Sequence, residues 1–142
     1  MKIIFDYNRT IYDPETGQLY PSVIELLRDL SAHHELFLVS QYESVRKKQV
    51  ADLGIARFFK EIVFVPSKTK SLFQDLAGRS KNAMVVGDRV QSEIYLGNEL
   101  GLVTVWFRRG KFRDEVPVDP REQPRHIIKN LNELYAIVAL YE

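Results

Sequence analysis

The sequence contains no cysteine. This absence excludes disulfide bridges, cysteine nucleophiles, thiolate zinc sites and iron–sulfur clusters. Glycine and proline are also scarce, at 7 and 6 residues, which excludes a low-complexity chain. No apolar run approaches the roughly 20 residues of a membrane-spanning helix, and the acidic residue Asp6 comes too early for a signal peptide. We therefore expect a cytoplasmic protein with no membrane partner.

An excess of charge of one sign is absent as well. Lys and Arg total 20 and Asp and Glu total 19, so the formal net charge is +1. A chain without a basic excess is not expected to bind nucleic acid through its charge. The 142 residues suffice for one domain, and the hydrophobic content of 45% suffices for a core that needs no metal or disulfide in order to fold. We predict a single domain over residues 1–142.

Short apolar runs alternate with longer segments whose apolar residues recur at helical spacing. The runs predicted as strands are 3–5, 35–39, 62–65, 83–86 and 103–107, with 127–128 as a further short strand segment. The segments predicted as helices are 22–30, 43–53, 67–76, 92–100 and 131–141. The polar, proline-containing stretch 108–125 predicts a long surface loop. Uniformly apolar strands that alternate with helices predict a three-layer α/β/α, Rossmann-like fold with a parallel sheet of about five strands.

Polar side chains follow four of the predicted strands. They are Asp6-Tyr7-Asn8, Ser40-Gln41, Lys68 (or Lys70) and Asp88. Taken singly, such residues are typical of helix caps and turns, but the carboxyl ends of parallel strands share one edge, where ligands bind. Two carboxylates at that edge repel one another unless a cation lies between them, and oxygen ligands suit Mg²⁺. A hydroxyl and an ammonium group supply donors to phosphate oxygens, so the set predicts phosphoryl-transfer chemistry with one aspartate as nucleophile.

The same residues resemble the motifs of the haloacid dehalogenase (HAD) superfamily. Residues 5–11 (FDYNRTI) resemble its first motif, hhDxDx[TV], and Val39-Ser40 resembles its second. Lys68 is similar to the third motif, with Lys70 as the alternative, and residues 85–89 (VVGDR) resemble the fourth. The resemblance covers residues 3–138 and implies the HAD-like version of the fold.

The resemblance implies a Mg²⁺-dependent phosphohydrolase or phosphotransferase in which Asp6 attacks phosphorus and becomes an aspartyl-phosphate. The implied catalytic residues are Asp6, Ser40 and Lys68. The implied substrate-binding residues are Tyr7, Asn8, Ser40, Gln41 and Lys68. The implied metal ligands are Asp6, Asp88 and the backbone carbonyl of Asn8, with Glu93 acting through a metal-bound water.

The sequence departs from the family pattern at Asn8. Phosphatases of the family carry an aspartate there, which protonates the leaving group and activates water, whereas an amide does neither. Loss of a general acid–base typically lowers the rate by roughly 10²–10⁴. Three interpretations stay open: a slow or specialised hydrolase, a persistent aspartyl-phosphate, or a noncatalytic binding or regulatory module. A phosphoacceptor domain of the response-regulator type shares this chemistry, but its aspartate follows a third strand rather than the first.

The sequence predicts no cap domain over the site. Residues 13–17 predict a small hairpin flap with its turn at Gly17, and residues 41–67 hold one helix and one strand. An uncapped site admits a phosphorylated small molecule or a macromolecule, or is closed by a second copy of the chain in a homo-oligomer.

The sequence also contains two basic stretches. Arg46-Lys47-Lys48 predicts a solvated helix face, and residues 108–113 are either a docking site for a phosphate-rich substrate or a loop made soluble by its charge.

Overall fold

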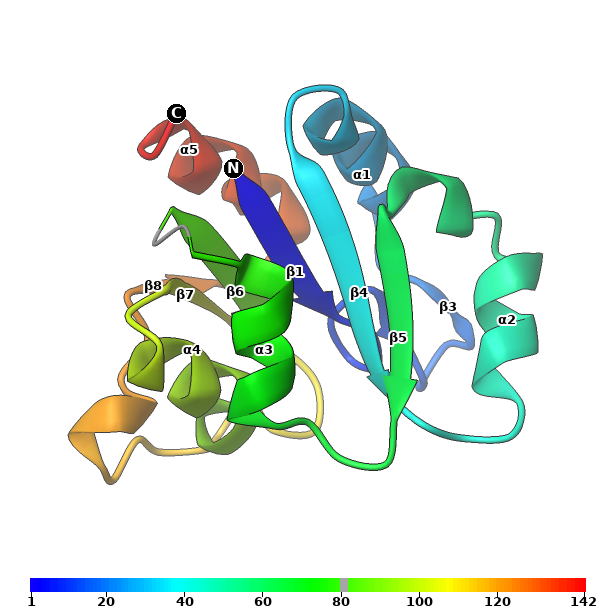
Figure 1. Cartoon of the computed structure of the whole chain (residues 1–142). Helices are drawn as coiled ribbons and strands as arrows, with labels where there is room; N and C mark the ends of the chain where they lie inside the picture. Colours follow the sequence, from blue (N-terminus) through cyan, green and yellow to red (C-terminus); the bar gives the residue numbers. More distant parts are fainter. Residues whose placement is uncertain (80–81) are drawn as a thin grey trace.

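The computed structural model describes residues 1–79 and 82–142 and has a six-stranded sheet at its centre (Figure 1). The strands are β1 (Lys2–Asp6), β4 (Glu35–Gln41), β5 (Glu61–Val65), β6 (Ala83–Gly87), β7 (Val103–Phe107) and β8 (His126–Ile128). They lie in the order β5-β4-β1-β6-β7-β8, and all neighbours are parallel. The predicted parallel α/β architecture is confirmed, with one strand more than five because β8 pairs with β7.

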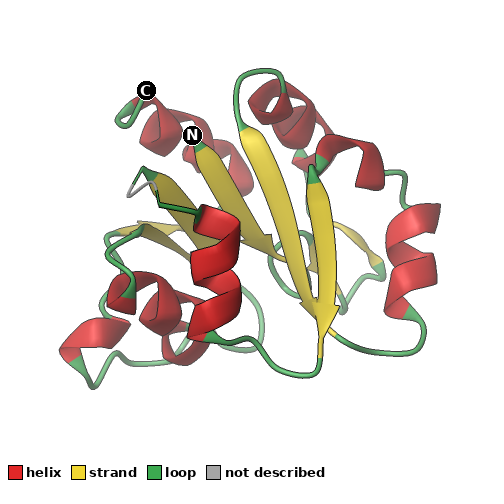
Figure 2. Cartoon of the chain, viewed as in Figure 1, coloured by secondary structure: helices red, strands yellow, loops and turns green. Residues whose placement is uncertain are grey.

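Helices cover both faces of the sheet (Figure 2). They are α1 (Val23–Ser31), α2 (Arg46–Asp52), α3 (Lys70–Ala77), α4 (Tyr95–Glu99) and α5 (Leu134–Ala139). Helices α3 and α4 lie on the near face in Figure 1, and α1 and α5 lie on the far face. Two predicted helices are divided: a π-helical turn, Val90–Ile94, precedes α4, and a 3₁₀ turn, Leu131–Glu133, precedes α5. None of the helices in the described ranges is long and apolar enough to cross a bilayer.

Strand β1 shows why the central strands are apolar throughout. Ile3 and Phe5 belong to the core on the side of α1 and α5, whereas Ile4 packs with Phe73 of α3 on the other side. Ile3, Ile4 and Phe5 are all fully buried. A strand covered on both faces needs apolar residues at successive positions, so the alternation expected of a half-exposed strand is missing.

Helix α3 begins three residues later than the sequence predicts. The side chain of Thr69 accepts a hydrogen bond from the backbone N–H of Leu72 at 3.2 Å and so caps the helix at residue 69. Lys68 therefore lies in the loop between β5 and α3, at the carboxyl edge of the sheet. This position leaves its long side chain free to reach the end of β1.

The segments in which a cap could be inserted are short. Between β1 and α1 the chain forms a hairpin of β2 (Tyr12–Asp13) and β3 (Gln18–Leu19), whose turn contains Gly17 with a φ of 72°. Between β4 and β5, within the described residues, lie α2 and the 3₁₀ turn Ala56–Phe58. In chain order, β4 and β5 lie on one side of β1, and the later strands β6, β7 and β8 lie on its other side. Such a switch point opens a crevice at the carboxyl ends of the strands.

Candidate active site

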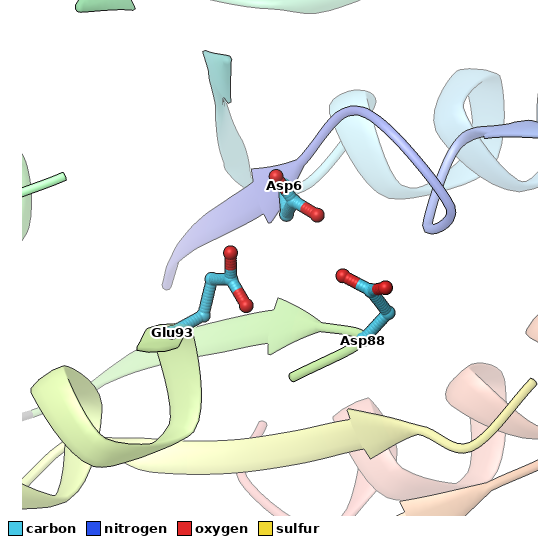
Figure 3. A group of neighbouring side chains, drawn as sticks. All are labelled: Asp6, Asp88 and Glu93. Carbon is cyan, nitrogen blue, oxygen red and sulfur yellow. The ribbon is translucent and has the colours of Figure 1, made fainter. Parts of the chain in front are cut away.

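Three buried carboxylates meet at this switch point (Figure 3). Asp6 is the last residue of β1, Asp88 directly follows β6, and Glu93 belongs to the π-helical turn after it. One carboxylate oxygen from each lies within 4.8 Å of the others, and each residue is 5% exposed or less. Figure 3 shows the three side chains directed toward one another. Three such groups cannot all carry charge in a buried space unless cations compensate them.

Lys68 supplies one of these cations. Its ammonium group donates hydrogen bonds to Asp6 and, at 2.5 Å, to Oε1 of Glu93. Burial alone would lower the pKa of Lys68, but the charges of the two carboxylates outweigh it, and the pKa lies above its usual value. Lys70, the alternative in the sequence, instead lies 3.9 Å from Glu99 on the surface. The structure therefore brings Lys68, and not Lys70, into the site.

One lysine does not satisfy the cluster. Burial, followed by the charges of Asp6 and Glu93, raises the pKa of Asp88 to about 10. Burial likewise raises the pKa of Glu93. Oδ2 of Asp88 and Oε2 of Glu93 are buried and accept no hydrogen bond from the described residues. Unpartnered carboxylate oxygens beside a third carboxylate fit a hard divalent cation such as Mg²⁺, which takes oxygen ligands.

The loop that carries Asp88 is fixed from two directions. The indole N–H of Trp106, in β7, donates to the backbone carbonyl of Asp88 at 2.9 Å. The carboxylate of Glu115, in the long loop after β7, accepts from the backbone N–H of Val90 at 2.6 Å and pairs with Arg89 at 3.1 Å. A carboxylate is favourable there because the first N–H groups of a helical turn have no partner within the turn. These bonds hold the carboxylate of Asp88 in place by holding its backbone.

The cluster forms the floor of a polar cavity of about 470 Å³. Six residues predicted from the sequence line it: Asp6, Asn8, Gln41, Lys68, Asp88 and Glu93. Six further residues complete the lining: Arg9, Arg46, Ser67, Arg89, Ser92 and Phe112. Carboxylates therefore occupy the floor, and arginines contribute to the walls. This arrangement suits an anionic ligand above a cluster that could hold a cation.

The side chain of Tyr7, predicted to bind substrate, does not line the cavity. It is fully buried, stacks on Tyr12 with ring centroids 5.4 Å apart, and donates from its hydroxyl to Oε1 of Gln49 at 2.8 Å. Burial raises its pKa. Side chains alternate between the two faces of a strand, so Tyr7 points to the side opposite Asp6.

Ser40 is also absent from the lining of the cavity. Its hydroxyl donates to the backbone carbonyl of Gln41 at 3.1 Å and accepts from Nη1 of Arg46 at 3.3 Å. The residue is fully buried. Arg46, which the sequence assigns to a solvated helix face, thus contacts Ser40 and also lines the cavity. The sequence carries no signal for this contact, because it predicts a helix over 43–53 and α2 begins only at Arg46.

Comparisons with known proteins find hydrolases and phosphatases. The sequence profile of the family described as HAD-hydrolase-like matches residues 66–134. The chain is 32% identical over 130 residues to a glyceraldehyde 3-phosphate phosphatase of Methanopyrus kandleri, covering 84% of this chain and 56% of that protein. It is 26% identical over 110 residues to a protein of the same name from Pyrococcus furiosus, covering 78% of this chain and 39% of that protein.

The chain is similar in sequence and fold to hydrolases of the HAD-like family. Among solved structures, the magnesium-bound HAD hydrolase YfnB of Bacillus subtilis has a TM-score of 0.71 and 27% identity, over 87% of this chain and 58% of that one. A haloacid dehalogenase-like protein of Burkholderia xenovorans has a TM-score of 0.81 at 12% identity, over 99% and 97% of the two chains, which shows the shared fold alone. This HAD-like chain spans about half the length of the curated phosphatases that it matches.

Proposed function

We propose that this chain is a Mg²⁺-dependent phosphatase that acts through an aspartyl-phosphate on Asp6. The observation that carries the proposal is the group of three buried carboxylates beside one lysine. Two oxygens of these carboxylates accept no hydrogen bond from the described residues. Asp6, Asp88 and the backbone carbonyl of Asn8 would hold the cation, with Glu93 beside it. When bound, Mg²⁺ supplies positive charge to the phosphoryl oxygens and separates the carboxylates from one another.

In the first step a carboxylate oxygen of Asp6 attacks phosphorus. A bond forms between this oxygen and phosphorus, and the bond between phosphorus and the leaving oxygen breaks, with its electron pair passing to that oxygen. In the second step water attacks the phosphorus of the aspartyl-phosphate, which frees phosphate and restores the carboxylate. Lys68 stays within reach of Asp6 in both steps and offsets the charge of the phosphoryl group.

Asn8 limits both steps. It lines the cavity two residues after Asp6, but an amide neither protonates the leaving oxygen nor removes a proton from water. The proton for the leaving group must then come from solvent, which the open cavity admits. We therefore infer a slow phosphatase that favours leaving groups stable as anions.

The short hairpin after β1 and the single helix after β4 support a single core domain over residues 1–142 without a cap. The names of the relatives support a phosphorylated small molecule as substrate. The second candidate function is a noncatalytic module that binds a phosphorylated ligand or a partner. Asn8 favours this alternative because it removes the general acid–base that family phosphatases use.

Phosphate release tests the proposal directly. The wild-type chain is incubated with nitrophenyl phosphate and with glyceraldehyde 3-phosphate, in excess Mg²⁺ or in EDTA. We expect release that requires Mg²⁺ and that Asp6→Asn abolishes. Asp75→Asn changes an exposed aspartate of α3 that does not line the cavity, so it is the matched control and should keep full activity. Equal release by Asp6→Asn and the wild type would contradict the mechanism, and Mg²⁺ binding without release from either substrate would favour the noncatalytic module.

A further inference from the structure

The basic residues that line the cavity are not equivalent. Three of them have carboxylate partners: Lys68 with Asp6 and Glu93, Arg46 with Glu43 at 2.8 Å, and Arg89 with Glu115 at 3.1 Å. The fourth, Arg9, has no carboxylate oxygen within 4.0 Å in the described part of the chain. A half-buried guanidinium without an anionic partner, on the wall of a cavity, is suited to an anion brought by a ligand.

The backbone of Arg9 is in an unusual conformation. Its φ is 63°, in the left-handed region that glycine adopts freely and that a residue with a side chain adopts at a cost. The N–H of Arg9 donates to the carbonyl of Tyr12 at 2.8 Å, which fixes the turn. Backbone strain of this kind occurs at ligand sites, where it serves to direct a side chain. Here the strained position carries an arginine that lines the cavity.

Phe112 defines the part of the cavity in which Arg9 lies. The Cζ atom of Arg9 is 5.3 Å from the centroid of the Phe112 ring, and that of Arg89 is 4.1 Å from it. An aromatic face holds a guanidinium while leaving its in-plane N–H groups free to donate. Arg9 forms no ion pair with Asp6, Asp88 or Glu93, and its guanidinium lies beside Phe112 instead.

We propose that Arg9 binds a second anionic group of the substrate, a carboxylate or a second phosphate, at the end away from the transferred phosphoryl group. The substrates are then small phosphorylated compounds that carry two anionic groups, an inference that rests on the proposed phosphatase function. A guanidinium donates two parallel hydrogen bonds to either group. The cavity of about 470 Å³ is of the size that holds a small metabolite. The basic loop that contains Phe112 therefore serves the site as well as the solubility of the chain.

Two pairs of substrates test the proposal. Glyceraldehyde 3-phosphate and 3-phosphoglycerate differ only in an aldehyde against a carboxylate, and propanediol monophosphate and bisphosphate differ by one phosphate. The readout is the kcat/KM of the member with two anionic groups divided by the kcat/KM of its partner. This ratio is measured for the wild type and for Arg9→Gln. We expect Arg9→Gln to lower this ratio by about 10- to 100-fold, as for loss of a charge-assisted hydrogen bond. The pair that shows the loss identifies carboxylate or phosphate as the second group.

Arg57→Gln is the matched control, because Arg57 also stacks on a phenylalanine ring, that of Phe58 at 4.6 Å, but is exposed and does not line the cavity. The ratio should not change in this variant. A loss by Arg9→Gln that is equal for both members of each pair would overturn the proposal, because Arg9 would then bind the transferred phosphoryl group. Unchanged kcat/KM values for all four compounds would overturn it as well.

Binding separates this proposal from the phosphatase function itself. If no substrate is hydrolysed, calorimetric titration with 3-phosphoglycerate and with glyceraldehyde 3-phosphate replaces the kinetic ratio. Tighter binding of 3-phosphoglycerate that Arg9→Gln removes would support the second anion site even though the phosphatase proposal fails. Equal affinities of wild type and Arg9→Gln for 3-phosphoglycerate would overturn the site whether or not the chain hydrolyses phosphate.

Discussion

The side chain of Glu93 lies directly against the backbone of Gly87. A Cβ atom at position 87 would stand 2.7 Å from Cβ of Glu93 and 2.9 Å from its Oε2. Real Cβ atoms do not approach other heavy atoms so closely, so only glycine permits this contact. Gly87 ends β6, and its missing side chain lets Glu93 turn back toward Asp6 and Asp88 (Figure 3).

Gly87→Ala should therefore disturb the carboxylate cluster. We expect the substitution to lower the free energy of unfolding by roughly 1–3 kcal/mol, the usual range for an overpacked site, and to weaken Mg²⁺ binding because Glu93 must move. Urea denaturation and calorimetric titration with Mg²⁺ measure the two effects. Gly54→Ala is the control: its φ of 70° makes alanine strained, but no atom lies within 4 Å, so Mg²⁺ affinity should not change. An unchanged Mg²⁺ affinity in Gly87→Ala would show that Glu93 does not matter to the cation.

Lys68 and Lys70 should differ sharply when each is replaced by methionine. Lys68 pairs with two buried carboxylates, whereas Lys70 is half-exposed and lies 3.9 Å from Glu99. Breaking a buried pair leaves uncompensated charge, so Lys68→Met should lower the free energy of unfolding by about 3 kcal/mol and phosphate release by at least about 10²-fold. Lys70→Met should leave both quantities close to those of the wild type. Similar losses in the two variants, in denaturation and phosphate-release assays, would show that the pairing of Lys68 has no special role.

The metal-free protein should lose stability as the pH rises. Burial and the neighbouring carboxylates raise the pKa of Asp88 to about 10 from its ordinary value of 3.8. Between these values the folded state holds a proton that the unfolded chain has released, so the free energy of unfolding falls with increasing pH. In EDTA, the urea midpoint should therefore decrease from about pH 7 to about pH 9, where ordinary carboxylates no longer titrate. Asp88→Asn should show a weaker decrease, and an equal decrease in both proteins would contradict the assignment.

The strand ends were the informative part of the sequence. Asp6, Lys68 and Asp88 follow different strands, and a parallel sheet brings the carboxyl ends of its strands to one edge, so their convergence could be predicted. The sequence also contained a signal for the position of Tyr7, whose side chain does not line the cavity. Ile3, Phe5 and Tyr7 alternate onto one face and belong to the same core cluster, which puts the side chain of Tyr7 opposite Asp6.

The walls of the cavity could not be predicted in the same way. Phe112 lies in the loop after β7, and its contact with Arg9 depends on the path of that loop, which no local pattern specifies. Arg46 belongs to a basic run that is typical of a solvated helix face, and its bond to Ser40 depends on where α2 begins. Periodicity locates strands and helices, whereas contacts between loops depend on tertiary packing.

Asn8 provides the most direct test of how the site works. It lines the cavity two residues after the proposed nucleophile, where an aspartate could protonate a leaving oxygen and then activate water. Asn8→Asp should raise turnover of an alkyl phosphate by about 10²–10⁴, the usual contribution of a general acid–base. Nitrophenyl phosphate should gain less, because nitrophenolate leaves without protonation. Mg²⁺ affinity should change little apart from the added charge, because the proposed ligand at this position is the backbone carbonyl. Phosphate release from both substrates and calorimetric titration with Mg²⁺ decide the question: if Mg²⁺ still binds and neither substrate gains, the amide is not what limits the reaction, and the noncatalytic module becomes the better account of this chain.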